Sequence, residues 1–398
     1  MSISLPLRPG LEGETPYGAP ELDVPVRLNV NENPYPPSPA VIESIATAVA
    51  QAATGLNRYP ERDFPDLRAA LADYLAAESG GRLDPTRIWA ANGSNEIMLH
   101  VLQAFGGPGR TCLTFTPTYS MYPEYARDTL TEYATRPRRA DFTIDAEGAA
   151  AAIEELHPAV VVLASPNNPT GTALPLADIQ AILGSARGNG PIATVGARGG
   201  GDGRPGRTDC VVVIDEAYAE FRRPGVPSAL ELLVDGANPH LAVTRTMSKA
   251  FGAAGLRLGY LAASRELVDA LRVVRLPYHL SALTQAAALA ALDHREELMG
   301  QVASLRSERD ALVAWLRGRG CTAHESDANF VLFGPFEDRD AVFAALLERG
   351  VLIRVVGPEG YLRVSIGTPD EMEAFRSALD GVLAGTGPRA PRAAAERP

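Results

Sequence analysis

The segment TRTMSKAFGAAGLRLGY, residues 244–260, contains the only lysine of the chain. The sequence has 37 basic side chains, and every one except Lys249 is an arginine. A guanidinium stays protonated in proteins, whereas a desolvated ammonium can lose its proton and attack a carbonyl carbon. Arginine can provide surface charge and bind anions as well as lysine can. The one lysine of the chain therefore indicates a reaction that needs an unprotonated amine. The alternative is a lysine left by chance on a solvated surface, and the neighbouring motifs decide between the two.

Four side chains near predicted strand ends are suited to holding a heteroaromatic ring beside that amine. Asp215 closes the apolar run VVVID, and its carboxylate can pair with a protonated pyridine nitrogen, because open α/β sheets bind ligands at the carboxyl ends of their strands. Tyr218 and, in the turn SPNNPTG, Asn168 can each hydrogen-bond a phenolate oxygen. Tyr119, in TPTYSMY, can stack on an aromatic ring. Each also has an ordinary structural reading, so only their joint occurrence indicates a site.

A site for an anion is indicated by ANGSNE, residues 91–96. Its glycine turn opens a predicted helix, so the backbone N–H groups near Ser94 and Asn95 point outward at the positive end of the helix dipole. Ser248, next to the lysine, and Arg257, eight residues after it, can complete a phosphate-binding cup. A glycine turn before a helix is common, so this signal is not specific by itself.

The elements that must position these side chains can be read from the apolar runs between residues 90 and 265. Short β-branched runs alternate there with helical segments, which is typical of a mostly parallel sheet covered on both faces. The pattern predicts an α/β fold. The predicted strands are TCLTF (111–115), AVVVLA (159–164), CVVVID (210–215), LAVTRT (241–246) and LGYLAA (258–263).

The pattern changes after Leu280, where residues 281–318 read as one long helical region. The shorter runs that follow predict a second, smaller α+β domain, and we expect the boundary between the domains inside this helical region. The predicted elements after it are ANFVLF (328–333), a helix at 339–349, VLIRVV (351–356), YLRVSIG (361–367) and a helix at 369–383.

These patterns predict a chain of four parts and one insertion. Residues 1–36 are rich in proline and form an extended arm that joins the small domain. Residues 37–290 form the large domain, 291–385 the small carboxyl-terminal domain and 386–398 a disordered tail. Residues 184–206 hold nine glycines and are expected to form a flexible surface insertion.

The glycines of this insertion do not indicate a dinucleotide site. Gly201, Gly203 and Gly206 match G-x-G-x-x-G by letter. That site requires a strand before the motif and a helix after it, whereas here a strand follows.

Overall charge and cysteine usage exclude several classes of function. The formal net charge of −11 argues against a general surface for nucleic acid or anionic membranes. The sequence shows neither a secretory leader nor an apolar run of about 18 residues, so we expect a cytoplasmic protein without membrane spans. Cys112, Cys210 and Cys321 lack the spacing of a disulfide framework or a zinc site, and no metal site is predicted.

Five of the motifs occur in a characteristic order: NGSNE, TPTYSMY, SPNNPTG, VIDEAY and TRTMSKAFGAAGLRLG. Together they resemble the fold-type I pyridoxal-phosphate-dependent aminotransferases over nearly the whole chain. The resemblance implies a mostly parallel sheet of the seven-stranded type in a large domain, a smaller α+β domain built from both chain ends, and a homodimer. It also implies pyridoxal 5'-phosphate as the cofactor.

The resemblance assigns roles to the residues at matching positions. Lys249 corresponds to the Schiff-base lysine, and Asp215 corresponds to the partner of the pyridine nitrogen. Tyr218 and Asn168 correspond to the partners of the ring oxygen, and Tyr119 corresponds to the residue stacked on the ring. The expected catalytic residues are therefore Lys249, Asp215 and Tyr218.

The same resemblance assigns the residues that bind the cofactor phosphate. Tyr59, in LNRYPER, matches a tyrosine that reaches the phosphate across the dimer interface. Within one chain, the phosphate is implied to be held by Ser94, Asn95, Ser248 and Arg257.

The two chain ends narrow the family. The opening TPYGAPELDVPVRLNVNENPYPPSP and the segment YLRVSIGTPDE are similar to those of histidinol-phosphate aminotransferases. In that family the positions of Tyr17, Arg354 and Arg363 bind the phosphate end of the substrate, and that of Arg363 also receives the α-carboxylate of glutamate. A guanidinium binds carboxylate and phosphate with the same bidentate geometry, so one site can serve both substrates. Val355 stands where the family usually has an acidic residue, and we expect it to loosen the orientation of Arg354.

The implied reaction interconverts L-histidinol phosphate plus 2-oxoglutarate and imidazole-acetol phosphate plus L-glutamate, a step of histidine biosynthesis. Two alternatives share these motifs, an aromatic or broad-range aminotransferase and a decarboxylase of a phosphorylated amino acid. A third is of another class, a non-catalytic regulatory protein that binds pyridoxal phosphate. Such proteins typically add a DNA-binding module, and no basic helix-turn-helix segment occurs in this sequence.

Overall fold

The structure is a computed structural model that describes residues 5–193 and 206–386. Most of the predicted glycine-rich insertion, including Gly201 and Gly203, and nearly all of the predicted tail lie outside the described residues. The insertion begins later than predicted, because residues 184–186 form the last turn of helix α6 (Leu176–Ala186). On its far side, Arg207 forms an isolated antiparallel bridge with Ile192.

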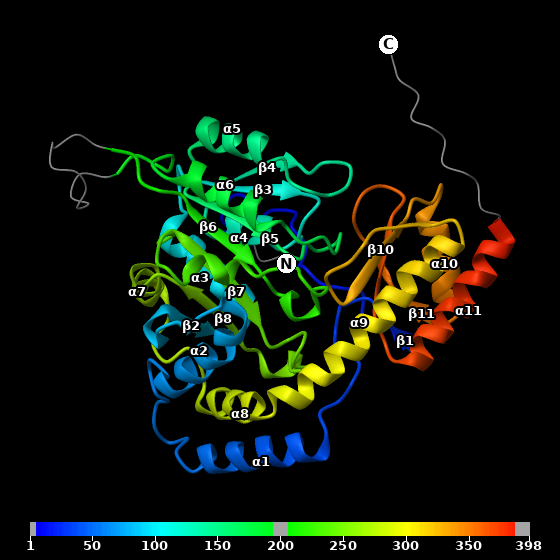
Figure 1. The fold of residues 1–398 in the computed structure, drawn as a ribbon, viewed down its shortest axis with the longest axis horizontal. Coiled ribbons are helices and arrows are strands. Elements are labelled where there is room, and N and C mark those ends of the chain that lie inside the picture. The colour runs from blue at the N-terminus through cyan, green and yellow to red at the C-terminus, as the bar shows by residue number, and fades with distance from the viewer. Residues whose placement is uncertain (1–4, 194–205, 387–398) are drawn as a thin grey trace.

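A seven-stranded sheet forms the centre of the larger part of the described chain (Figure 1). In spatial order its strands are β2 (Ile88–Ala91), β8 (Gly259–Ala263), β7 (Leu241–Thr246), β6 (Val211–Asp215), β5 (Val160–Ala164), β3 (Thr111–Thr116) and β4 (Glu132–Pro137). Strand β8 is antiparallel to both of its neighbours, and the other neighbouring pairs are parallel. Every residue of β2, β5, β6, β7 and β8 is buried, as expected for a sheet covered on both faces. The five predicted strands are confirmed, and β2 and β4 are additional to them.

The direction of these strands brings distant segments together at one edge of the sheet. Strands β2, β3, β5, β6 and β7 all end at this edge, and the antiparallel strand β8 begins there. The segments that follow the strands therefore lie side by side although they are far apart in sequence. The residues at this edge that end a strand are Ala91, Thr116, Pro137 of the parallel edge strand β4, Ala164, Asp215 and Thr246.

Helices surround this sheet, and local capping explains where several of them begin. Ser38, Ser264 and Ser281 each accept a hydrogen bond from the backbone N–H three residues further on, which satisfies a free donor of the first helical turn. Besides α6, the helices of this part are α1 (Pro39–Ala53), α2 (Pro65–Ser79), α3 (Ser94–Phe105), α4 (Tyr122–Asp128), α5 (Ala146–Leu156), α7 (Arg265–Val274) and α8 (Ala282–Asp293). Short 3-10 turns occur at η1 (Pro85–Arg87), η2 (Ala219–Phe221), η3 (Ala229–Leu233) and η4 (Ala254–Leu256).

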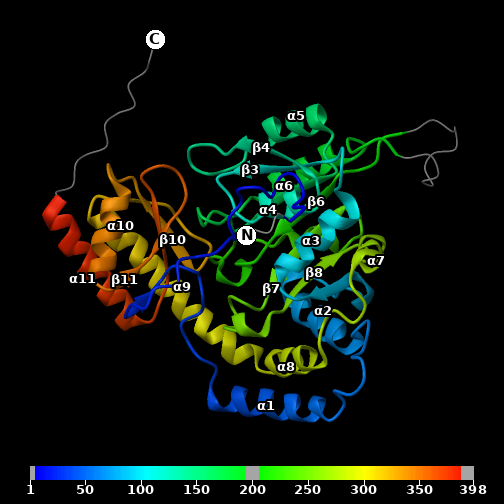
Figure 2. The ribbon, with the colours of Figure 1, turned by 180° about the vertical axis from the view of Figure 1, so that it is seen from behind.

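The smaller part of the molecule is built around a four-stranded antiparallel sheet with the order β12-β13-β10-β9. A parallel pair, β1 with β11, attaches the N-terminal arm to it, and Figure 2 shows the arm reaching β1 before it continues to α1. The elements are β1 (Val26–Arg27), α9 (Arg295–Gly318), β9 (Thr322–Ala323), β10 (Phe330–Gly334), α10 (Arg339–Glu348), β11 (Val351–Leu352), β12 (Arg354–Val355), β13 (Leu362–Ser365) and α11 (Pro369–Thr386).

Two hydrophobic cores meet along helix α9. Figure 1 shows this helix running from the larger part of the molecule to the smaller one. Leu298 belongs to the core around the seven-stranded sheet, whereas Val302 and Leu305 belong to the core of the smaller part. The predicted helical region 281–318 is two helices rather than one, because the chain turns at His294 between α8 and α9. We therefore propose that the boundary between the two domains lies within α9, near Met299, which packs against both cores.

No helix of the described residues is long and apolar enough to cross a membrane. The described part of the chain also holds no group of three or more histidine, cysteine or acidic side chains that could bind a metal ion. Cys112, Cys210 and Cys321 are free thiols, and the first two are buried.

Candidate active site

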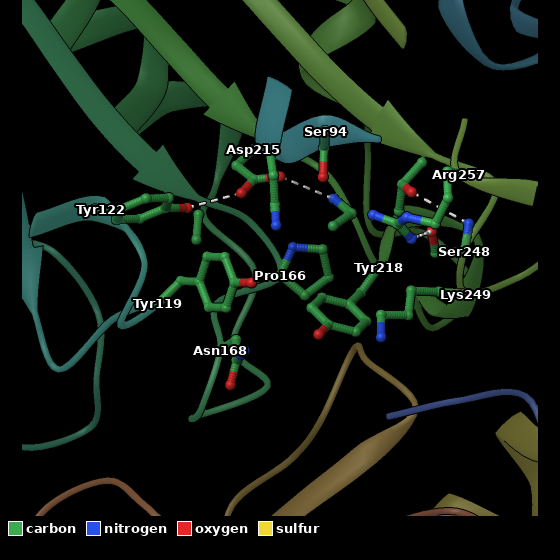
Figure 3. A pocket seen from close by; sticks show the side chains of 14 residues that line it. Ser94, Tyr119, Tyr122, Pro166, Asn168, Asp215, Tyr218, Ser248, Lys249 and Arg257 are labelled. Carbon is green, nitrogen blue, oxygen red and sulfur yellow. Dashed lines mark hydrogen bonds between the residues drawn. The ribbon is translucent and has the colours of Figure 1, made fainter. Parts of the chain in front are cut away.

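A cavity of about 210 Å³ lies at the carboxyl edge of the seven-stranded sheet (Figure 3). Nine predicted site residues line it, although they come from six separate segments of the chain. They are Ser94, Asn95, Tyr119, Asn168, Asp215, Tyr218, Ser248, Lys249 and Arg257. The sheet therefore brings the expected amine, carboxylate, ring partners and anion-binding groups into one place.

One side of the cavity is suited to an anion. Helix α3 begins at Ser94 after Gly93, which has φ +87° and gives the helix no side-chain cap, so its first N–H groups are available to a ligand. Arg257 Nη1 donates to the Ser248 hydroxyl at 3.3 Å (Figure 3). Strand β8 packs closely against the start of α3, and this approach requires glycine at position 259, because a Cβ there would lie 2.1 Å from the Ser94 nitrogen. These groups can together bind a phosphate with its charge partly neutralised.

Asp215 provides a buried negative charge on another side of the cavity. Its Oδ2 accepts a hydrogen bond from the Tyr122 hydroxyl at 2.8 Å (Figure 3). Its Oδ1 accepts one from the Thr244 hydroxyl at 3.1 Å. Burial raises the pKa of Asp215, while the hydrogen bonds from Tyr122 and Thr244 lower it. A cation placed beside this carboxylate would favour its ionised form, so the site is suited to a protonated ring nitrogen.

Lys249 contributes the amine of the cavity, and a contact with the N-terminal arm holds this amine in place. Its Nζ donates to the backbone oxygen of Val30 at 3.0 Å, a contact with the N-terminal arm. Burial lowers the pKa of Lys249 to about 8, and the charges of Arg363 and Arg257 act in the same direction. About a tenth of this amine would be unprotonated at neutral pH, far more than for an unperturbed lysine. A nucleophile and proton acceptor is thus available without a further base.

We expect this lowered pKa to appear directly in the labelling of the apoprotein. The labelling rate of Lys249 by acetic anhydride, relative to a reference amine, should rise with pH and level off above about pH 8 to 9. The rate depends on the unprotonated fraction, and the lowered pKa brings that fraction to its maximum earlier. Because the chain has no other lysine, peptide mass spectrometry needs to separate this site only from the terminal amine. A midpoint near the ordinary value of 10.5 would contradict the prediction.

Arg363 is a buried guanidinium adjacent to the cavity. Its Nη1 donates to Asn168 Oδ1 at 2.6 Å, and its Nη2 donates to the backbone oxygen of Asn29 at 2.8 Å. Its Nε has no hydrogen-bond partner among the described residues. Burial lowers the pKa of Arg363 to about 10, so the group remains a cation at neutral pH. An incoming carboxylate or phosphate would provide the missing partner and charge.

The other three predicted residues lie outside the cavity lining of the single chain. Tyr17 is partly exposed and shares a hydrogen bond of 2.9 Å with Ser120. Arg354 makes a long hydrogen bond of 3.4 Å to the backbone oxygen of Gly18. Tyr59 is 80% exposed and stacks on Tyr278 with the ring centroids 4.5 Å apart.

Several residues contact the site without having been identified from the sequence. Tyr122 and Thr244 hold Asp215, and Asn31 Nδ2 donates to the Tyr218 hydroxyl at 2.9 Å. Tyr122 belongs to the quoted motif TPTYSMY, three residues after Tyr119, so its position was a usable signal. Asn31 has no such signal, because its place depends on where the arm packs.

Comparisons with known proteins show that most of the chain is similar to aminotransferases. The sequence model of the family described as Aminotransferase class I and II matches residues 24–193 and 206–379. The histidinol-phosphate aminotransferase of Thermobifida fusca (strain YX) is 58% identical over 375 residues, which cover 94% of this chain and 95% of that protein. That of Bifidobacterium longum (strain NCC 2705) is 56% identical over 386 residues, which cover 96% and 97%.

Solved structures show the same similarity in three dimensions. The histidinol-phosphate aminotransferase from Sinorhizobium meliloti, in complex with pyridoxal-5'-phosphate, superposes with a TM-score of 0.75 at 25% identity, covering 92% of each chain. The aspartate aminotransferase from Thermus thermophilus with maleate superposes with a TM-score of 0.74 at 25% identity, covering 90% of this chain and 91% of that one.

Proposed function

The chain belongs to the class I and II aminotransferases and, within them, to the histidinol-phosphate aminotransferases, and from this premise we propose that it exchanges the amino group between L-histidinol phosphate and 2-oxoglutarate. The products are imidazole-acetol phosphate and L-glutamate. The observation that carries the proposal is a single cavity lined by one amine of lowered pKa, one buried carboxylate and an anion-binding helix start.

The residues of the cavity fit pyridoxal 5'-phosphate as the cofactor. The free N–H groups at the start of α3, with Ser248 and Arg257, would hold its phosphate. Asp215 would pair with its ring nitrogen, and Tyr119 would stack on its ring. When bound, this group supplies an aldehyde that reacts with amines and a ring that accepts the electron pair released at the substrate α-carbon.

The chain's own residues position the substrate and move its proton. The Lys249 amine, unprotonated in part at neutral pH, would take the proton from the substrate α-carbon and deliver it to the carbon of the cofactor that carried the aldehyde. Asp215 keeps the ring nitrogen protonated through its negative charge. Tyr218 and Asn168 orient the ring oxygen, and Asn31 fixes the direction of the Tyr218 hydroxyl.

Arg363 is the residue that allows two different substrates to use one site. Its guanidinium can receive either the α-carboxylate of glutamate or the phosphate end of histidinol phosphate, since each presents two oxygens that can accept a pair of parallel N–H bonds. Arg354 and Tyr17 would add to the binding of the phosphate end. Arg363 also donates to Asn168, the residue that would orient the cofactor ring oxygen, so the group that binds the substrate anion is bonded directly to a group that holds the cofactor.

A homodimer would complete the phosphate site through Tyr59. The segment around Tyr59 lies against the segment around Tyr278, and Val273 and Leu276 on that segment are strongly exposed apolar residues. Exposed apolar patches of this kind mark contact surfaces. We expect sedimentation at micromolar concentration to give a dimer, and Tyr59→Phe to weaken cofactor binding by about tenfold with no loss of dimerisation. A monomeric active protein would contradict this part of the proposal.

We expect Tyr122→Phe to lower the rate of α-proton removal by about tenfold while the protein remains folded and coloured. The variant loses the hydrogen bond to Asp215 but keeps the carboxylate, so only part of the stabilisation of its charge is removed. The measurement is the single-turnover rate with glutamate at several pH values. Thr244→Val, which removes the bond to the other carboxylate oxygen, is the matched control.

The experiment that tests the function compares substrates on one preparation. We expect kcat/KM for L-histidinol phosphate with 2-oxoglutarate to exceed that for phenylalanine by about 10²-fold or more, because phenylalanine offers an α-carboxylate to Arg363 but lacks the phosphate that Arg354 and Tyr17 would also bind. Equal turnover of phenylalanine would instead support a broad-range aminotransferase. Release of carbon dioxide from a phosphorylated amino acid would support a decarboxylase, and a cofactor band without turnover of any amino acid would support a binding protein.

A further inference from the structure

Five charged side chains form a cluster on the side of the sheet away from the cavity, which we call the back-face ion cluster. Its centre is Arg245 on β7, whose side chain is 1% exposed. Arg245 donates to Glu216 Oε2 at 2.9 Å and to Glu220 Oε1 at 3.0 Å. It also donates to Glu78 Oε2 at 2.7 Å, an atom that it shares with Arg222 at 2.8 Å. Three carboxylates thus face two guanidinium groups.

The geometry of two strands connects this cluster to the site. Asp215 is paired with Thr244 in the register of β6 and β7, and the next backbone N–H, of Glu216, donates to the Thr244 oxygen at 2.9 Å. Successive side chains of a strand point to opposite faces. Thr244 therefore bonds to Asp215 at the cavity, while Arg245 bonds to Glu216 behind it. The ends of β6 and β7 are therefore joined twice, by the Thr244–Asp215 bond on the cavity face and by the Arg245–Glu216 bond on the opposite face.

Glu216 is a buried carboxylate that needs a cation. Its side chain is 2% exposed, and it accepts the Ser228 hydroxyl at 2.8 Å and the Ala229 N–H at 2.7 Å. Neither of these donors removes its charge. Among the described residues, Arg245 is the guanidinium that bonds to it, whereas Arg222 reaches Glu78. An unpaired charge here, adjacent in the chain to Asp215, would act on the cavity through a medium of low dielectric constant.

We propose that Arg245 is a positioning residue for transamination, which neutralises Glu216 and joins the ends of β6 and β7 so that Asp215 and Lys249 are held in place at the cofactor. The inference rests on the cofactor roles proposed above for Asp215 and Lys249. Lys249 follows Arg245 by four residues, and β7 ends between them at Thr246, so a displaced strand end would displace the amine.

The proposal predicts electrostatic effects of opposite sign in two charge-neutralising variants. Arg245→Gln leaves Glu216 unpaired, so the surroundings become more negative and the pH midpoint of the cofactor's visible band rises by about 0.5 to 1 unit. Glu216→Gln removes one negative charge while Arg245 keeps its bonds to Glu220 and Glu78, so the surroundings become less negative and the midpoint falls by a similar amount. The double variant removes both charges and restores the midpoint to within about 0.2 unit of the parent, with most of the transamination rate regained.

The matched control is Arg222→Gln. This variant removes a cation from the same cluster but leaves the bond between Arg245 and Glu216 in place. We expect it to lower the thermal unfolding temperature without moving the cofactor midpoint. A merely structural role of the cluster would give the same pattern for Arg222→Gln and Arg245→Gln.

Other titratable groups act on the same charges and are unchanged in all of these variants. Those that interact with Asp215 or Lys249 are Tyr119, Tyr122, Tyr125, Tyr218, Glu32, Arg257 and Arg363. Those that interact with Arg245 from the back of the sheet are Tyr74, Tyr260, Glu78 and Glu220. A difference in the pH midpoint between these variants therefore comes from the substitution of Arg245 or Glu216.

The outcomes separate this inference from the proposed function. A parent protein without a cofactor band would contradict the function itself. A normal parent band with unshifted midpoints in both single variants, or with shifts of the same sign, would overturn the role of Arg245. Should Arg245→Gln fail to fold, the comparison of Glu216→Gln with the double variant decides, since an unshifted midpoint in Glu216→Gln overturns the proposal.

Discussion

Replacement of Lys249 by arginine is expected to abolish transamination in a protein that remains folded. Arginine retains the positive charge but stays protonated, so it can neither attack an aldehyde nor remove a proton from carbon. We expect kcat with L-histidinol phosphate and 2-oxoglutarate to fall by about 10³-fold or more, because the nucleophile and the general base are lost together. Steady-state assays and mass spectrometry of borohydride-reduced digests measure the two losses separately.

A second lysine placed elsewhere provides the control for this variant. Arg82 is an exposed residue paired with Asp73, and its side chain is 65% exposed. Arg82→Lys adds an accessible amine, yet the reduced cofactor adduct should remain on Lys249. In the Lys249→Arg background the same change should restore neither the adduct nor turnover. Activity of Lys249→Arg within about tenfold of the parent would contradict the assignment of the amine.

The cavity lining was largely predictable because its residues follow strand ends. Asp215 closes β6 and Asn168 follows β5, so identifying two buried parallel strands is enough to place both side chains at one edge. The same holds for Tyr119 after β3 and Lys249 after β7, whereas Ser94 was indicated by the glycine turn that opens its helix. A local pattern was sufficient because the parallel sheet itself determines which segments become neighbours.

Contacts made by the N-terminal arm were not predictable in this way. Val30 accepts the bond from Lys249 and Asn31 bonds to Tyr218, across separations of 219 and 187 residues. The arm reaches them because Val26 and Arg27 pair in parallel with Val351 and Leu352. Such a contact depends on tertiary packing between distant segments, for which a single sequence carries no periodic signal.

Some elements of the fold were also missed for local reasons. Strand β2 has the sequence IWAA, in which two alanines give little β preference, and β4 is an edge strand without a buried residue, three of its six being exposed and three half-buried. The run VLIRVV is divided between two sheets, since β11 pairs with β1 and β12 pairs with β13. The helical region is interrupted at His294, although buried apolar residues continue on both sides of it, at Leu292 in α8 and Leu298 in α9. Propensity and periodicity predict whether a segment is a helix or a strand, but they do not predict which other segment it pairs with.

Asp215→Asn is expected to slow α-proton removal by about 10²-fold or more while the protein still binds the cofactor. The amide is nearly the same size as the carboxylate, but it cannot carry the negative charge that keeps a ring nitrogen protonated. Moreover, Tyr122, Thr244 and the Ala217 N–H all donate to this carboxylate, so an amide must turn one N–H group toward a donor. The measurement is the single-turnover rate with glutamate and with α-deuterated glutamate.

Comparison with Tyr122→Phe separates the charge from its hydrogen bonds. Both variants lose the bond between Tyr122 and Asp215 in its native form, but only Asp215→Asn loses the charge. If the charge is what stabilises the electron pair released at the α-carbon, the deuterium isotope effect should increase in Asp215→Asn, since proton removal becomes rate-limiting, and the rate should lie about tenfold or more below that of Tyr122→Phe. Equal rates in the two variants would show that the hydrogen bonds, and not the charge, account for the role of Asp215.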